Sequence, residues 1–286
     1  MERTGGERFV LVSFHAHPDD EALLTGGTLA RAAAEGHRVV LVVATDGAAG
    51  LSDGPGGRQL AQRRARELER SARALGVARV VRLGHRDSGY AAPVEDRVDD
   101  RADGPVGPVF SRLPVERVAA ELAQVLRQEG ADVLTSYDAR GGYGHPDHVH
   151  VHRCGAAAAA LAGTPVVLEA TVDRTLVRAA LRVVGLLPGV VGEVTARRVG
   201  EGFTARQEIT HRVDVRAHTA AKRAALTAHA SQSETGGVRG VRGIGLLLLL
   251  PRPLFRRLLG REWFVERGRA PGGRPLDDVF AGVRGR

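Results

Sequence analysis

Residues 8–45 read RFVLVSFHAHPDDEALLTGGTLARAAAEGHRVVLVVAT, and two apolar runs frame this stretch. Arg8–Phe14 is short and rich in Val and Phe, which predicts a buried strand. Asp20–Glu35 has the pattern of a helix that stops at Gly36, and His37–Thr45 is a second apolar run. Apolar residues without polar alternation are typical of strands covered on both faces, as in a parallel sheet. The stretch therefore predicts a strand–helix–strand unit.

The same alternation continues along the chain. Further helices are predicted at Gln59–Leu75, Val115–Glu129, His148–Leu161 and Arg216–His229, and further strands at Val77–Leu83, Val133–Tyr137, Pro165–Val172, Glu208–Val215 and Glu262–Val265. This order is typical of an α/β protein with a doubly wound, mostly parallel sheet in a three-layer Rossmann-like sandwich. We expect the first five strands in the order 3-2-1-4-5.

The domain organisation follows from length and from the segments that break this rhythm. A chain of 286 residues is within reach of one large α/β domain. We expect a single domain over residues 1–268, with rim loops near 84–113 and 174–207. The first of these segments is rich in Pro and Gly, and a long loop in a compact domain usually has a function. Residues 269–286 are expected to form a loosely held tail.

Composition excludes several classes of protein. Cys154 is the only cysteine, which excludes an intramolecular disulfide and a cysteine-based zinc cluster, and we expect it to be a buried helix residue. The longest apolar run, Gly243–Leu250, is too short to span a bilayer, so no membrane association is expected. Met1–Arg8 lacks the plan of a signal peptide. These features predict a soluble, cytoplasmic protein.

The positive charge does not indicate nucleic-acid binding. The formal net charge is +8, but arginines and acids are interleaved along the predicted helix at residues 59–75. Aromatic residues make up 4% of the chain, and no basic stripe carries them. Solvated helix faces explain most of this charge. The expected partner is a small molecule, and a homo-oligomer is compatible with the sequence.

Two polar clusters follow strands that we expect to be neighbours. His17-Pro18-Asp19-Asp20-Glu21 comes after the first strand, and His145-Pro146-Asp147-His148 after the fourth. In the expected strand order these strands meet at the switch point, where ligands bind outside their carboxyl ends. Either cluster alone is compatible with ordinary helix capping, with Pro at the helix start and acids in the first turn. The two together predict one site.

The residue types in these clusters suit zinc or a similar divalent ion. His17 and Asp20 are close enough to share one ion, and His148 could complete the set. Three protein ligands leave a position for water, as in catalytic zinc sites. Asp19 is not needed as a ligand and can take the proton of that water. His145 can act as a cationic acid or an electrostatic partner on the other side.

The other histidines have simpler interpretations. We expect His15 to pack or to form a hydrogen bond near the end of the sheet, and His150 to be solvated. His152 lies four residues beyond His148 on the same helix face, so it competes with His148 as a ligand. We favour a structural role for His152.

Both clusters resemble the motifs of a known family. His15-Ala16-His17-Pro18-Asp19-Asp20-Glu21 with Gly26-Gly27-Thr28, and Gly141-Gly142-Tyr143-Gly144-His145-Pro146-Asp147-His148, are similar to the PIG-L/LmbE-like zinc-dependent N-acetylglucosaminyl deacetylases. Weaker similarities are Arg64-x-x-Glu67-Leu68, Arg86-Asp87-Ser88-Gly89 and Lys222-x-x-Ala225-Leu226 with His229-x-Ser231-Gln232. The resemblance is closest to the actinobacterial branch that contains the mycothiol-pathway deacetylase and the mycothiol-conjugate amidase.

This resemblance implies roles for nine residues. It makes His17, Asp20 and His148 the ligands of one zinc ion per chain, although another divalent ion such as Fe²⁺ would also suit them. The implied roles of the others are general base for Asp19, proton donor or oxyanion partner for His145, orientation of that histidine for Asp147, oxyanion stabilisation for Tyr143, and binding of substrate hydroxyls for Arg64 and Asp87.

Simpler interpretations remain for the last two residues. Arg64 could instead pair with a glutamate on its own helix, and Asp87 could cap a turn before Gly89. The sequence as a whole predicts a metal-dependent amide hydrolase that removes an acetyl group from an N-acetylated amino sugar or its conjugate. The alternatives are an amidase for a larger sugar–thiol conjugate and a non-catalytic Rossmann-like module that binds sugars or nucleotides.

Overall fold

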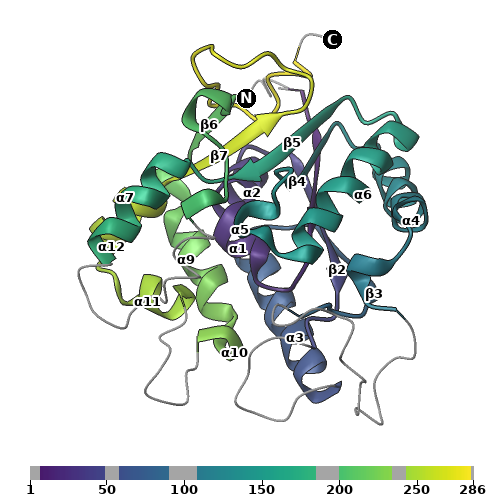
Figure 1. Cartoon of the computed structure of the whole chain (residues 1–286), viewed down its shortest axis with the longest axis horizontal. Coiled ribbons are helices and arrows are strands. Elements are labelled where there is room, and N and C mark those ends of the chain that lie inside the picture. The colour runs from purple at the N-terminus through teal and green to yellow at the C-terminus, as the bar shows by residue number, and fades with distance from the viewer. Residues whose placement is uncertain (1–6, 49–57, 90–107, 185–199, 234–242, 285–286) are drawn as a thin grey trace, which may run out of the picture.

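The computed structural model describes residues 7–48, 58–89, 108–184, 200–233 and 243–284. A seven-stranded sheet with the order β3-β2-β1-β4-β5-β7-β6 crosses the middle of the molecule (Figure 1). Its strands are β1 (Val10–His15), β2 (Arg38–Thr45), β3 (Arg79–His85), β4 (Val133–Tyr137), β5 (Val166–Thr171), β6 (His211–Asp214) and β7 (Arg261–Glu266).

Helices occupy both faces of this sheet. They are α1 (Asp20–Leu24), α2 (Gly26–Ala34), α3 (Arg58–Ala74), α4 (Val115–Glu129), α5 (Gly141–Gly144), α6 (Pro146–Ala162), α7 (Arg174–Val184), α9 (Thr219–Ala228), α10 (Ala230–Ser233), α11 (Gly243–Leu249) and α12 (Arg252–Leu259), with 3₁₀ turns at Phe110–Arg112, Arg206–Glu208 and Arg216–His218. Within the described ranges, no helix is both long and apolar enough to cross a membrane.

The expected strand order is confirmed. Strands β1 to β5 are parallel and lie in the order 3-2-1-4-5. The two C-terminal strands extend the sheet beyond β5, and β7 is antiparallel to both β5 and β6. The sheet is therefore mostly parallel, and the doubly wound α/β class is also confirmed.

The apolar strands are buried on both faces, as their sequences predict. Leu11 and Val39 belong to one hydrophobic cluster, whereas Val12 and Val40, the next residues along, belong to another. Side chains of α4 and α6 pack on the second cluster, and those of α2, α9 and α12 on the first. Figure 1 shows α4 and α6 on one side of the strands and α9 and α12 on the other. The molecule therefore has three layers.

The helix expected over residues 20–35 is two helices, so that prediction is wrong in one detail. The break is at Thr25, whose hydroxyl donates to the Glu21 carbonyl and also lies 3.0 Å from Nε2 of the His15 ring. The second helix starts so close to the residue that follows β6 that a Cβ at Gly27 would lie 2.5 Å from the Val215 side chain. Glycine is required at that close approach.

A buried carboxylate holds the start of α2. The backbone N–H groups of Gly27 and Thr28 donate to Glu262 at 2.8 and 2.7 Å. Nζ of Lys222 lies 2.6 Å from the same carboxylate, and both side chains are buried. A helix N-terminus favours a negative charge. The ion pair therefore links α2, α9 and β7 across one face of the sheet.

The C-terminal segment is not a loose tail, so that expectation is also wrong. Phe280 is 1% exposed and stacks on Phe9, with ring centroids 5.2 Å apart. Val279 and Val283 are buried in the same cluster, and the Asp277 carboxylate pairs with Arg31. Apolar residues spaced along 279–283 are the signal that the high Gly and Arg content obscures.

The two expected rim loops are only partly visible. Residues 90–107 of the first and 185–199 of the second lie outside the described residues. The described part of the second segment begins with α7. In the first, Phe110 is fully buried and its N–H donates to the Arg86 carbonyl. This hydrogen bond joins the two ends of the first segment just after β3.

The Lys222–Glu262 pair predicts a large stability effect. Lys222→Met leaves a buried carboxylate with only backbone donors, so we expect the free energy of unfolding to fall by about 3 kcal/mol. Chemical denaturation measures this loss. Arg269→Ala, which breaks an exposed pair with Glu266, is the control and should cost less than about 1 kcal/mol. Equal effects of the two variants would contradict the proposed link.

Candidate active site

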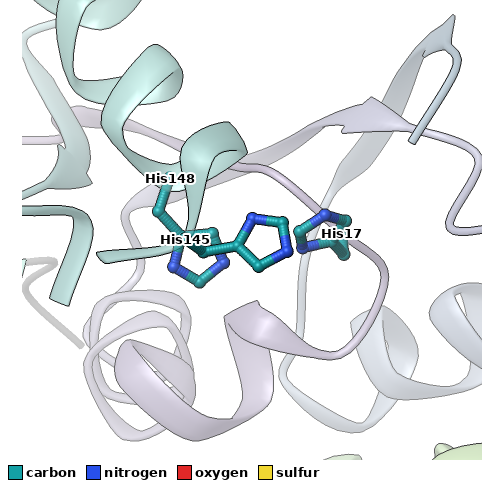
Figure 2. Close-up of side chains that lie close together, drawn as sticks. All are labelled: His17, His145 and His148. Atoms are coloured by element: carbon teal, nitrogen blue, oxygen red, sulfur yellow. The ribbon is translucent and has the colours of Figure 1, made fainter. Parts of the chain in front are cut away.

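The two polar clusters meet at the carboxyl ends of β1 and β4, which are neighbours in the sheet. His17 and Asp20 lie in the turn from β1 into α1, and His145 and His148 lie at the start of α6. Figure 2 shows the rings of His17, His145 and His148 close together. Their centroids are 4.7 to 5.4 Å apart. The fold thus brings together residues about 130 positions apart in sequence, as the strand order predicts.

Three side-chain atoms that could bind a metal ion converge at this edge of the sheet. Oδ2 of Asp20 lies 3.2 Å from Nδ1 of His17 and 3.4 Å from Nε2 of His148. The His148 side chain is buried, and its Nε2 has no hydrogen-bond partner among the described residues. Burying a polar nitrogen without a partner is costly, and a metal ion would satisfy it. Two imidazoles and a carboxylate suit zinc, so these residues fit the ion.

His145 is a second candidate for the third ligand. One nitrogen from each of His17, His145 and His148 lies within 4.8 Å of the other two. Distance alone therefore does not choose between His145 and Asp20. Nδ1 of His145 accepts the backbone N–H of Asp147 at 3.1 Å and so caps α6, which leaves only the other ring nitrogen for an ion.

The carboxylate of Asp147 contacts His17, whereas the sequence analysis expects it to orient His145. Its Oδ2 lies 3.1 Å from Nε2 of His17, and Oδ1 of Asp87 lies 3.5 Å from the same nitrogen. Burial alone would lower the pKa of His17, but Asp87 and Asp147 raise it well above its ordinary value. A carboxylate behind a ligating histidine fixes its ring and tautomer. This geometry suits Nδ1 of His17 as the metal-facing atom.

Asp19 is held apart from the metal-facing atoms. Its Oδ2 lies 3.1 Å from the guanidinium of Arg64, a buried residue of α3. Burial raises the pKa of Asp19 to about 6, and Arg64 opposes that shift. A carboxylate with a raised pKa is a better base near neutral pH. The residue also has a φ of 132°, a strained backbone region for a residue with a side chain.

The residues expected to hold substrate hydroxyls are engaged within the protein. The guanidinium of Arg64 donates to the carbonyls of Gly47 and Pro18 as well as contacting Asp19. On the same helix it is Arg63, not Arg64, that pairs with a glutamate. Oδ1 of Asp87 accepts the backbone N–H of Gly89, which is the turn cap weighed above. A role in substrate binding for these two residues stays a prediction.

His145 and Tyr143 lie beside His148. The Tyr143 ring centroid is 5.2 Å from that of His148 and 6.2 Å from that of His145. Burial, together with the nearby rings of His17 and His148, lowers the pKa of His145 to about 4. This direction favours a neutral imidazole, whereas the sequence allows a cationic acid at this position. A neutral ring can still donate one hydrogen bond.

Two residues that support the site have no role in the sequence analysis. Tyr137 stacks on His148, with centroids 4.2 Å apart and planes 4° apart. Asp138 accepts the backbone N–H of Gly142 at 2.9 Å and that of Arg140 at 3.1 Å, so it pins the turn that carries Tyr143. Tyr137 ends the fourth predicted strand and Asp138 follows it, and this position is the only sequence signal for them.

The remaining histidines and the cysteine are buried or partly buried. His15 bonds Ser13 and lies against Tyr137, as expected, and Cys154 is buried in α6, as expected. His152 bonds the carbonyl of Tyr137 instead of joining the three donors. The expectation that His150 is solvated is wrong, because it is 4% exposed and its ring lies against Phe110.

The convergence of these possible metal ligands predicts which substitutions prevent metal binding. We expect His148→Ala and Asp20→Asn to abolish tight zinc binding, because each removes a donor from the shared point. His152→Ala, one helical turn away, is the matched control and should retain its metal. Elemental analysis after dialysis measures the difference. His145→Ala belongs in the same series, since loss of zinc from it and not from Asp20→Asn would make His145 the third ligand.

Comparisons with known proteins identify the family of this chain. Residues 12–159 match the family model described as GlcNAc-PI de-N-acetylase, PIG-L. The chain is 34% identical to a 1D-myo-inositol 2-acetamido-2-deoxy-alpha-D-glucopyranoside deacetylase of Streptomyces griseus, over 99% of this chain and 91% of that protein. A second relative so named, from Thermobifida fusca, is 36% identical over 80% of this chain and 85% of its own length.

Solved structures show the same fold at lower identity. The N,N'-diacetylchitobiose deacetylase of Pyrococcus horikoshii matches with a TM-score of 0.54 and 21% identity, over 92% of this chain and 84% of that one. The family model covers half of the chain, and the Streptomyces relative covers nearly all of it. The chain belongs to the PIG-L family, the GlcNAc-PI de-N-acetylase family.

Proposed function

We propose that this protein is a metal-dependent N-deacetylase that removes the acetyl group from an N-acetylated amino sugar or its conjugate. The observation that carries the proposal is the convergence of His17, Asp20 and His148 beside a separately held carboxylate, Asp19. A metal site that can activate water, together with a carboxylate that can accept its proton, is what metal-assisted hydrolysis of an amide uses. Membership of the PIG-L family supports the same reaction.

The residues divide the work of amide hydrolysis. A zinc ion held by His17, Asp20 and His148 would polarise the acetamide carbonyl and lower the pKa of water at the site. Asp19 takes a proton from the water that adds to the acetamide carbon. Tyr143 and His145 donate hydrogen bonds to the carbonyl oxygen as it becomes negative. The C–N bond then breaks, the amine leaves with the proton that Asp19 accepted, and acetate remains.

The relatives suggest the class of substrate. The Streptomyces griseus and Thermobifida fusca proteins are named for the N-acetylglucosamine glycoside of myo-inositol. An acetamide is small, so most of the binding energy must come from the rest of the substrate. We therefore propose an N-acetylglucosaminyl inositol as the first substrate to test, with the acetylated amine on its sugar ring.

The alternatives rest on weaker ground. An amidase for a sugar–thiol conjugate would use the same donors and a different rim, and much of the rim lies outside the described residues. The fold does not choose the reaction, because a 4-carboxy-2-hydroxymuconate hydratase of Pseudomonas putida also matches, with a TM-score of 0.57 and 15% identity over 93% of this chain and 99% of that one. The argument for deacetylation therefore rests on the site and the family.

A substrate panel tests the proposal directly. Zinc-loaded protein is incubated with the N-acetylglucosaminyl inositol, with free N-acetylglucosamine and with a sugar–thiol conjugate amide. We expect acetate and a free amine from the inositol glycoside, and loss of both products after chelation of the metal. Release of a larger acid from the conjugate alone would favour the amidase. No product from any member would support a binding module.

Asp19 should affect turnover without affecting the metal. Because it contacts Arg64 and not the ligand atoms, Asp19→Asn should keep full zinc content and lose kcat by ~10²–10⁴, the usual scale for a general base. Steady-state kinetics with elemental analysis measures both quantities. Asp214→Asn, an aspartate paired with Arg216 far from the site, is the control. Near-normal turnover of Asp19→Asn would assign the proton transfer to another group.

A further inference from the structure

Glu21, the last residue of the first motif, is completely buried and has no task in the reaction described above. Its Oε1 accepts a hydrogen bond from the Ser71 hydroxyl at 2.5 Å and lies 2.7 Å from Nε2 of His229. Its Oε2 accepts the backbone N–H of Asp19 at 3.0 Å. A carboxylate leaves water at a high cost, and these partners are what makes its burial tolerable.

His229 reaches this carboxylate from 208 positions away in the sequence. It is fully buried at the end of α9, and α9 packs against both α1 and α3 (Figure 1). Its other ring nitrogen, Nδ1, has no hydrogen-bond partner among the described residues. Burial alone would lower the pKa of His229, but Glu21 raises it above its ordinary value. The ring is therefore committed to Glu21.

Asp19 is held at two points, and His229 secures one of them. Arg64 holds its carboxylate, while Glu21 holds its backbone N–H. A φ of 132° at a residue other than glycine is strained and persists only when its surroundings enforce it. The bond from the Asp19 N–H to Glu21 is one such restraint, and the bond from the Ala22 N–H to the Asp19 carbonyl is another.

We propose that His229 is a positioning residue for Asp19, acting through the buried carboxylate of Glu21. The proposal deepens the proposed function, and it rests on that function for its kinetic test. His229 fixes the carboxylate, the carboxylate fixes the backbone of Asp19, and the backbone aims the base at the water. A group two contacts away from the base thereby influences the rate of the proton transfer.

The same segment supplies a matched control. Ser231, two residues beyond His229, is buried and donates to Glu67 of α3 through both its hydroxyl and its backbone N–H. It ties the same part of the chain to α3, and neither of these bonds involves Asp19 or Glu21. Ser231→Ala therefore removes a comparable buried hydrogen bond without releasing the base.

The experiment compares His229→Leu, His229→Gln and Ser231→Ala with the unchanged protein. The measurements are kcat and KM, bound zinc, the unfolding midpoint, and hydrogen exchange of the Asp19 amide. In His229→Leu we expect kcat to fall by 10- to 100-fold, about the scale for a supporting partner of a site. KM and zinc content should stay unchanged, and the Asp19 amide should exchange faster. His229→Gln keeps one donor and should recover most of kcat.

Ser231→Ala should lower the unfolding midpoint and leave kcat and Asp19 exchange unchanged. The proposal is overturned if His229→Leu keeps its kcat, if its loss of activity matches its loss of zinc, or if Asp19 exchange does not change. Should His229→Leu fail to fold, Glu21→Gln tests the same link, because it weakens the acceptor for the Asp19 amide. Failure of the deacetylase reaction itself would show in the unchanged protein, whereas amide exchange tests the His229 link without any substrate.

Discussion

Three consecutive carboxylates are withdrawn from water at the carboxyl end of β1, and the rest of the site depends on how each is neutralised. Asp19 takes Arg64 from α3, Asp20 takes the two histidines at the proposed metal point, and Glu21 takes His229 from the end of α9. Adjacent negative charges in a region of low dielectric repel strongly unless each has its own partner. Partners from α3, α6 and the end of α9 must therefore come together around this short turn.

That requirement explains why so much of the chain converges on one sheet edge. The stretch from α9 into α10 supplies Lys222 to Glu262 at the start of α2, His229 to Glu21 of α1, and Ser231 to Glu67 of α3. All three acceptors are buried carboxylates, and breaking such a pair costs far more than its formation contributes. These contacts hold the C-terminal third of the chain against its N-terminal half. Because Glu21 contacts both His229 and the backbone of Asp19, the packing of the C-terminal third and the geometry of the base are linked.

The sequence predicts the elements that depend on local pattern and misses those that depend on distant partners. Unbroken apolar runs such as residues 37–45 identify the parallel strands, and their order places the two clusters together. The break at Thr25 is invisible to helical periodicity, because the contacts around it come from His15 and from Glu262, which is more than 230 positions away and holds the start of the second helix. His150 likewise has the spacing of a solvated residue, and its burial comes from Phe110 in a segment with no regular pattern.

The same limit applies inside the site. The motifs identify His17, Asp20 and His148, because the residue types and spacing of ligands are visible in short stretches of sequence. The partner of Asp147 depends instead on the direction of its side chain at the start of α6. There the backbone N–H of Asp147 donates to Nδ1 of His145, which caps the helix. The Asp147 carboxylate instead contacts the ring of His17. A residue next to a histidine in sequence thus serves a histidine 130 positions away. In a site built from two strand ends, neighbours across the sheet determine function more strongly than neighbours along the chain, and the proposed task of His229 follows the same rule.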